Sequence, residues 1–177
     1  MIATPLDYLF VKTINSFKTE VRELYDKRAL MPCLMLLYSF IDILSWLRYE
    51  KKYKKVWERY IKFAESYLLP NSRLKCTPED IYSARCGILH QYSSESDLVK
   101  ADNAKEIHYR AHDKEKNDEK KHTVIRDDPN IITIQIEDLI HAFEKSIEKL
   151  KKDLTTNVML ELEVVERSRS WLVQFDN

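Results

Sequence analysis

The sequence predicts a single all-α domain built as an up-and-down helical bundle, and three observations support that fold class. The chain has 177 residues, which is enough for one substantial hydrophobic core. It contains one glycine and five prolines, so it lacks the turn residues that many-stranded folds use. Apolar side chains recur every three or four residues along much of the chain, as in amphipathic helices. With no repeat and no interdomain linker, residues 1–177 are expected to form one domain.

Charge and cysteine content narrow the class of protein. The 29 basic and 29 acidic residues cancel, which argues against the broad basic surface of a nucleic-acid-binding protein, so no DNA partner is expected, although a local basic cleft is compatible with this balance. The cysteines Cys33, Cys76 and Cys86 are odd in number and widely spaced, unlike a disulfide framework or a zinc site. The first residues are charged and amphipathic, unlike a signal peptide. We therefore expect a cytoplasmic protein with no metal and no cofactor.

Two helices are expected in the first third of the chain. Thr4, Pro5 and Asp7 predict the start of one, whose apolar stripe continues to about residue 24. Residues 29–49 predict a second helix, apolar almost all round, which needs cover from its own chain or from a second copy. It is nearly long enough to cross a membrane. Because Asp42 lies within it, a buried helix is favoured over a transmembrane one.

Further along, the pattern predicts a third helix over residues 53–68 and a fourth that begins at Thr77 and Pro78. An insertion of about residues 95–135 follows, in which two short segments are expected to pair as a small β-hairpin near 105–135. A fifth helix is predicted over residues 136–154. The C-terminal extension, about residues 155–177, has a pattern that suits either a strand or a helix.

One segment departs from this pattern. The run "SARCGILHQYSS", residues 83–94, places the only glycine, Gly87, between Arg85 and His90. Arg85 falls in the apolar stripe of its helix, where a guanidinium needs an acid or an anion. Side chains five residues apart on an α-helix point roughly 140° away from each other. Arg85 and His90 therefore act together only if the helix ends near Gly87, or if each meets its counterpart across a two-fold axis.

The spacing of this segment resembles a known signature. It resembles the arginine-x4-histidine-x-tyrosine motif of the HEPN superfamily, with Arg85, His90 and Tyr92 at the three motif positions. Its members are small helical bundles, commonly homodimers, and many are metal-independent ribonucleases that act as toxins, in phage defence or in RNA processing. The resemblance covers about residues 4–155 loosely, and only the motif is specific. It implies a homodimer, for which the apolar second helix offers an interface unless it is a monomer's central helix.

The resemblance also implies an endoribonuclease, and the residue types suit that chemistry. The 2′-hydroxyl of RNA is the nucleophile that attacks the neighbouring phosphate. His90 suits the proton transfers because histidine titrates near neutrality. Arg85 suits the phosphate because a guanidinium offers it two parallel hydrogen bonds. The two motifs of a dimer would supply one histidine as base and one as acid.

Two residues beside the motif pair bear on activity and partners. Active members usually carry a polar residue directly after the arginine, where this chain has Cys86, a weak hydrogen-bonding group. The alternative is therefore an inactive module that binds a nucleotide, RNA or a protein partner, and a purely structural dimer module is a third hypothesis. In some members a partner nucleotidyltransferase modifies the motif tyrosine. Tyr92 thus implies such an enzyme as a partner.

A structural role is the alternative for the charged residues. Asp42, an acid isolated in an apolar helix, is expected to pair with Arg85, and Ser39 lies one turn away from that pair. Taken alone, His90 would bond the last carbonyls of its helix. The lysine-rich run "KKYKK" at 51–55 offers a place for RNA backbone, although a solvated helix end is the default interpretation.

Overall fold

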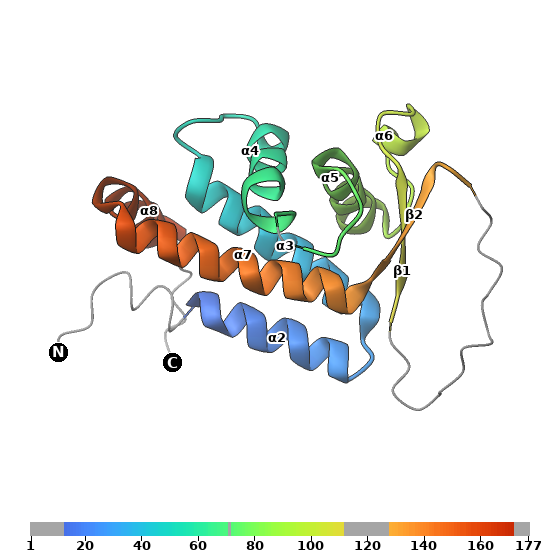
Figure 1. Ribbon diagram of the computed structural model, residues 1–177, viewed down its shortest axis with the longest axis horizontal. Coiled ribbons are helices and arrows are strands. Elements are labelled where there is room, and N and C mark those ends of the chain that lie inside the picture. Colours follow the sequence, from blue (N-terminus) through green and yellow to red (C-terminus); the bar gives the residue numbers. More distant parts are fainter. Residues whose placement is uncertain (1–12, 71, 112–127, 172–177) are drawn as a thin grey trace.

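The computed structural model describes residues 13–70, 72–111 and 128–171, and these form a mainly helical fold (Figure 1). The predicted helix start at Thr4, Pro5 and Asp7 lies outside the described residues. The remainder of that first helix is α2, Asn15–Asp26, which buries Phe17, Val21 and Tyr25. The spacing of these three residues by four places them on one face, as the sequence pattern predicts.

The central element is α3, Leu30–Tyr49, which confirms the predicted second helix. Helices α2, α4, α5, α7 and α8 all contact it, and this cover explains why its apolar side chains extend all round. Phe40 of α3 stacks on Phe17 of α2, with ring centroids 3.7 Å apart. By length and composition alone, α3 is also the one helix of the described residues that could cross a membrane. Half of its most apolar window is buried within the fold.

Two helices lie above α3 in Figure 1 and carry most of the candidate site. Helix α4, Val56–Phe63, continues into a π-helical turn, η2, at Ala64–Leu68, so the predicted third helix begins three residues later than expected. Helix α5, Pro78–Cys86, begins at Thr77 as predicted. The Thr77 hydroxyl accepts from the Asp80 amide, and the Asp80 carboxylate accepts from the Thr77 amide, which satisfies two helix-end donors. A second π-helical turn, η3, Gly87–Gln91, follows α5 without a break.

The insertion contains a short helix, α6, Asp97–Lys100, and two strands, β1, Glu106–Arg110, and β2, Ile131–Gln135. The strands lie where the sequence predicts them, but the predicted hairpin is wrong because they pair in parallel, with Glu106 opposite Ile131. A hairpin joins its strands by a turn of about two to five residues. Residues 111–130 separate these strands, which is long enough for the crossover that parallel pairing needs.

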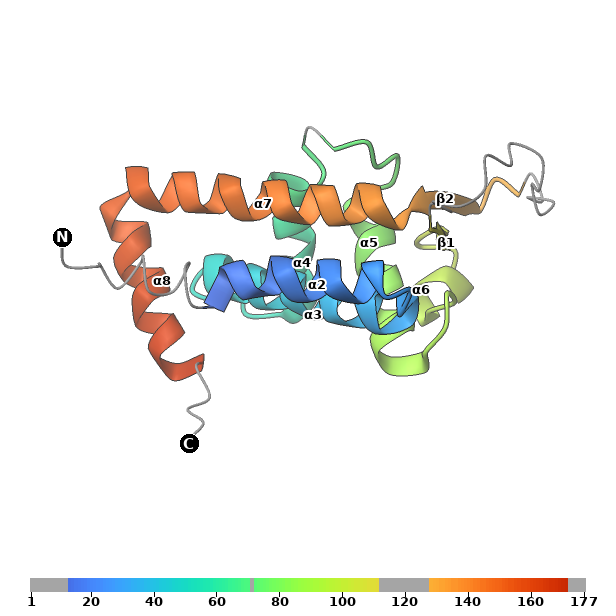
Figure 2. The same ribbon diagram turned by 90° about the horizontal axis from the view of Figure 1, so that it is seen from below.

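The C-terminal part, from Ile136 to Trp171, is helical except at Asn157. Helix α7, Ile136–Thr156, follows β2 directly and confirms the predicted fifth helix, while α8, Val158–Trp171, resolves the ambiguous extension in favour of a helix. Figure 2 shows α8 turning steeply away from α7, at the point where Asn157 adopts an extended conformation. Since α8 also contacts α3, it closes one end of the bundle.

Candidate active site

Arg85 lies in the last turn of α5 and forms the expected ion pair with Asp42 of α3. Its Nη2 atom is 2.5 Å from Oδ2 of Asp42, and the two side chains are 13% and 22% exposed. Burial lowers the pKa of Arg85, but the charge and hydrogen bond of Asp42 outweigh it, so this pKa lies above its usual value. Each charge would be costly to bury alone on an apolar helix face, and the ion pair offsets that cost. Ser39 does not join it, because its hydroxyl donates to the carbonyl of Met35 instead.

His90 reaches the same arginine from five residues away. Nη1 of Arg85 lies 3.0 Å from Nε2 of His90. An undistorted α-helix would hold the two side chains apart, but residues 87–91 form the π-helical turn η3. A π-helix bonds each residue to the fifth along the chain, and its wider turn brings side chains at that spacing nearer to one face than an α-helix does. The Arg85–His90 contact is therefore made within one chain, where α5 ends beside Gly87 as expected but the chain continues as the π-helical turn η3.

The chemistry of the two groups sets the direction of this hydrogen bond. A guanidinium has only donors, so Nε2 of His90 must be the acceptor. A neutral imidazole that accepts at Nε2 carries its proton on Nδ1. Arg85 thus holds Asp42 with one terminal nitrogen and an unprotonated ring nitrogen of His90 with the other.

Gly87 allows this turn for a reason other than the backbone freedom that the sequence suggested. The α-helix α5 does end beside Gly87, as expected, but the φ of −59° and ψ of −51° are ordinary helical values, so the chain continues into η3 without using the glycine's backbone freedom. A Cβ atom at this position would lie 2.6 Å from the carbonyl oxygen of Ser93, because the chain folds back over the glycine. The reversal occurs at Tyr92, whose φ of 52° is left-handed. The only glycine is required by close approach of the backbone.

The other two motif-associated residues are placed differently. The Sγ atom of Cys86 is 4.0 Å from Nη1 of Arg85, so the thiol touches the pair and contributes a weak acceptor. Tyr92 is 64% exposed, and its side chain points away from the core. The structure therefore brings Arg85, His90, Asp42 and Cys86 together and leaves Tyr92 on the surface beside them.

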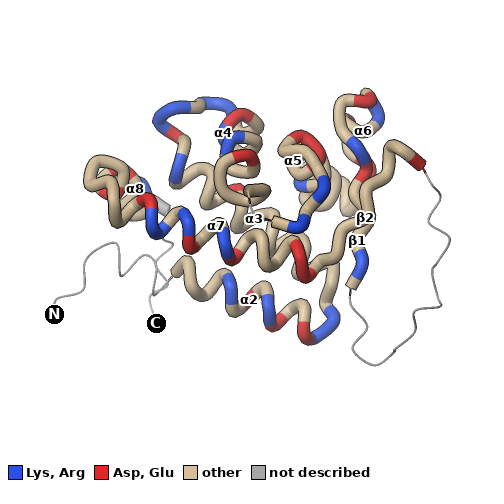
Figure 3. The backbone as a smooth tube through the Cα atoms, in the orientation of Figure 1, with Lys and Arg blue, Asp and Glu red and all other residues tan. Residues whose placement is uncertain are grey.

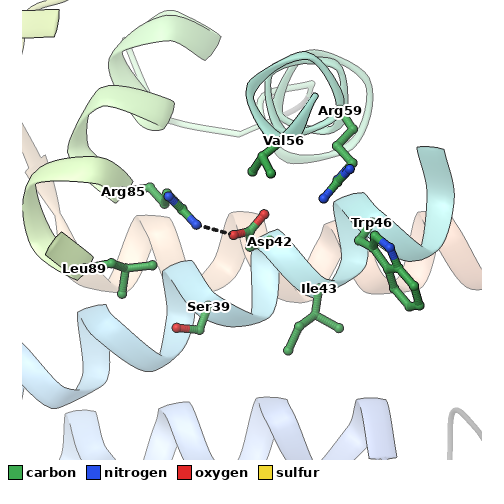
Figure 4. A pocket seen from close by; sticks show the side chains of 8 residues that line it. All are labelled: Ser39, Asp42, Ile43, Trp46, Val56, Arg59, Arg85 and Leu89. Carbon is green, nitrogen blue, oxygen red and sulfur yellow. Dashed lines mark hydrogen bonds and ion pairs between the residues drawn. The ribbon is translucent and has the colours of Figure 1, made fainter. Parts of the chain in front are cut away.

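Arg85 separates two hollows in the surface. One, of about 560 Å³, lies between α3 and α4 and is shown in Figure 4. The other, of about 420 Å³, lies between α5, η3 and α6 and contains His90 and Cys86. Arg85 lines both, so an anion that enters from either side can reach its guanidinium. We call the first hollow the α3–α4 groove.

Two residues of the α3–α4 groove have no counterpart in the sequence analysis. Trp46 follows Asp42 by four positions on α3, and Arg59 extends from α4 towards α3 (Figure 4). In the sequence, Trp46 belongs to a run that is apolar all round, and Arg59 belongs to an ordinary amphipathic helix. The sequence offers only two hints: Trp46 lies four residues after Asp42, and Arg59 lies shortly after the lysine-rich run at 51–55. These hints point to a shared site only when α3 and α4 are known to be neighbours.

A buried phenol lies behind the pair. Tyr60 of α4 is fully buried, and its hydroxyl has no hydrogen-bond partner among the described residues. Burial, and then the negative charge of Asp42, raises the pKa of Tyr60 well above its usual value. The phenol therefore stays neutral and adds no charge to the site.

Comparison with known proteins does not identify a family for this chain. No family model matches the chain, and the comparisons with curated proteins and with solved structures gave no match. The resemblance to the HEPN superfamily therefore stays a prediction that depends on the motif formed by Arg85, His90 and Tyr92.

Proposed function

We propose that the chain is a metal-independent endoribonuclease of HEPN type, toxin-like or defence-like, with Arg85 and His90 as its catalytic residues. The observation that carries the proposal is the 3.0 Å contact between Nη1 of Arg85 and Nε2 of His90, at a point open to two surface hollows. A fixed cation beside an imidazole with an unprotonated ring nitrogen is what cleavage of RNA at its 2′-hydroxyl requires.

Arg85 is the phosphate-binding group in this mechanism. Asp42 holds Nη2 and so fixes the plane of the guanidinium, while Nη1 faces His90 in the hollow between α5, η3 and α6. A non-bridging phosphate oxygen that takes the Nη1 bond would meet a donor already in position. Such a donor stabilises the charge that builds up on phosphate as the 2′-oxygen adds, and losing it costs roughly a hundredfold to a thousandfold in rate.

His90 carries the proton in this mechanism. Its Nε2 atom removes the proton of the 2′-hydroxyl, and the 2′-oxygen forms a bond to phosphorus. The bond from phosphorus to the 5′-oxygen breaks, and that oxygen takes a proton from a general acid. The products are a 2′,3′-cyclic phosphate and a 5′-hydroxyl, with no net change in protons.

The general acid is the reason to propose a dimer. Among the described residues that line the two hollows, His90 is the only histidine. One imidazole that has just accepted the nucleophile's proton lies on the wrong side of an in-line displacement to protonate the leaving group. A second copy of the chain, bringing its own Arg85 and His90 to the same phosphate, supplies the acid.

The test is cleavage of single-stranded RNA in EDTA. We expect His90→Ala to lower the rate by about a hundredfold or more, since one general base contributes about that much. His141→Ala is the matched control, because His141 is an exposed histidine on α7 beside Arg22 and Glu144. Equal rates for the wild-type protein and the His90 variant would overturn the proposal.

A second candidate function is an inactive module that binds RNA, a nucleotide or a protein partner through the same surface. Cys86 favours it, because the thiol occupies the place next to Arg85 where active relatives are expected to carry a stronger hydrogen-bonding group. The exposed phenol of Tyr92 suits modification by a partner nucleotidyltransferase. Binding of RNA without cleavage in the same assay would select this function.

A further inference from the structure

We propose that the α3–α4 groove binds the nucleotide adjoining the scissile phosphate of a single RNA strand. Arg59 would hold its phosphate, and Trp46 would stack on its base. This inference rests on the proposed function, because Arg85 lies between the groove and the hollow that contains His90, where the scissile phosphate would bind. It adds to the proposed cleavage site a binding site for a neighbouring nucleotide of the substrate.

Arg59 is better suited than Arg85 to attract a new anion. Arg85 is already neutralised by Asp42, whereas Arg59 forms no ion pair within the described residues. Its Nη1 atom donates to the carbonyl oxygen of Lys54 at 3.3 Å. Its Nε atom is buried and has no hydrogen-bond partner among the described residues. Because Arg59 lines the groove and its guanidinium retains its charge without an acidic partner in the described part of the chain, it favours an anionic ligand there.

Trp46 supplies the aromatic surface. It lies on the face of α3 that carries Asp42, one turn further along, and its half-buried ring lines the groove below Arg59 (Figure 4). Stacking of a base on such a ring contributes roughly 1–3 kcal/mol and tolerates any base. The ring and the guanidinium therefore address the two parts of one nucleotide, its base and its phosphate.

Size and charge agree with this occupant. The volume of about 560 Å³ falls within the roughly 300–1,000 Å³ typical of small-ligand sites. Two guanidinium groups face one carboxylate, which leaves one positive charge in excess. Apolar side chains of Ile43 and Val56 complete the walls and suit the flat face of a base.

The groove leads to a basic surface. The loop between α3 and α4 carries four exposed lysines, and Figure 3 shows this concentration of positive charge above the end of α3. The four are Lys51, Lys52, Lys54 and Lys55. Single-stranded nucleic acid is commonly bound by stacking surfaces that a basic track extends. A single strand is the form of RNA that fits, because a duplex keeps its bases stacked on each other.

The test measures binding of a short 2′-O-methyl oligoribonucleotide, which has no free 2′-hydroxyl and cannot be cleaved by this route. We expect Arg59→Ala and Trp46→Leu each to weaken binding about tenfold. Arg59→Ala should also lower the slope of log Kd against log salt concentration by about 0.7, and Trp46→Leu should leave it unchanged. Trp46→Phe, which keeps an aromatic ring, should bind within about threefold of the wild-type protein.

The matched controls are Arg73→Ala and Trp57→Leu. Arg73 is highly exposed and pairs with Asp138 of α7, and Trp57 is 45% exposed next to Lys55, outside the groove. Both variants should bind like the wild-type protein. The proposal is overturned if the two groove variants bind normally, or if the controls lose as much affinity as they do.

The outcomes also separate this proposal from the nuclease. Oligonucleotide binding that depends on Arg59 and Trp46, in a protein that cleaves no RNA, would leave the subsite standing and remove the nuclease. Cleavage of RNA that depends on His90, with binding indifferent to Arg59 and Trp46, would do the reverse.

Discussion

Arg85 and His90 are five residues apart and lie on one side of their helix, with Nη1 of the arginine 3.0 Å from Nε2 of the histidine. The turn between them is π-helical, so the motif spacing coincides with the repeat of the local hydrogen bonding. Asp42 grips the other edge of the guanidinium from α3. The position of the two side chains thus depends on the shape of one short turn and on one ion pair, and each can be tested.

Gly87→Ala tests the turn. Alanine is the better helix former by about 1 kcal/mol, but its methyl group would meet the Ser93 carbonyl oxygen at 2.6 Å. We expect the clash to dominate and the free energy of unfolding to fall by about 1–2 kcal/mol, measured by urea denaturation. Gln91→Ala, an exposed change in the same turn, is the control and should have little effect. A stabilised Gly87→Ala variant would contradict the close approach.

A double-mutant cycle tests the ion pair between Asp42 and Arg85. Since the two side chains are only 22% and 13% exposed, removing either leaves the other charge poorly solvated. We expect the free energies of unfolding of Asp42→Ala, Arg85→Ala and the double variant to give a coupling of about 1–3 kcal/mol. Additive effects would show that the contact contributes nothing to stability.

The phenols of Tyr38 and Tyr109 test the link between α3 and β1. Their hydroxyl oxygens are 2.6 Å apart, and burial is the main cause that raises the pKa of each phenol. We expect Tyr109→Phe to cost about 1–2 kcal/mol, because it leaves the Tyr38 hydroxyl buried without a partner. Replacing both by phenylalanine should cost less than the two single changes together. Tyr92→Phe, on the surface, is the control, and a neutral Tyr109→Phe would contradict the bond.

Glu144 gives a pH-dependent test of the contact between α2 and α7. Its carboxylate accepts from Nε and Nη2 of Arg22, both at 2.8 Å. Burial raises the pKa of Glu144, but the bonds and charge of Arg22 outweigh it, so this pKa lies below its ordinary value of 4.5. The stabilisation is therefore fully present above that value and is lost as the pH falls through the lowered pKa.

We expect Glu144→Gln to lower the free energy of unfolding by about 1 kcal/mol near pH 7, and by less near pH 3. Glu148→Gln is the control, because Glu148 is 70% exposed and lies 3.7 Å from Lys18. A Glu144→Gln effect that is the same at both pH values would contradict the ion pair.

Much of the frame is encoded locally and could be predicted. Three features follow from local chemistry, because a free helix end, an exposed apolar helix and an unpaired buried charge are each unfavourable. They are the cap at Thr77, the cover over residues 29–49 and the pairing of Asp42 with Arg85. The Asp42–Arg85 pair was predictable because each residue is an isolated charge on an apolar helix face. Of these three predictions, only the Asp42–Arg85 pair names two segments that are distant in the sequence.

The rest depends on information that the sequence pattern does not hold. A π-helical turn has no sequence signature of its own, so the sequence could bring Arg85 and His90 together only through a helix end near Gly87 or across a two-fold axis. The sequence pattern marks β1 and β2 as strands, but the same residue types suit parallel and antiparallel pairing, so the pattern does not give the direction. Trp46 and Arg59 become neighbours only through the packing of α3 on α4.

The ends of the RNA fragments formed in EDTA decide whether Arg85 and His90 cleave RNA through its 2′-hydroxyl. We expect the wild-type protein to leave 2′,3′-cyclic phosphate and 5′-hydroxyl ends, and His90→Ala to form them at least about a hundredfold more slowly. Fragments with 5′-phosphate ends, or equal formation of cyclic phosphate by the His90→Ala variant, would contradict this mechanism.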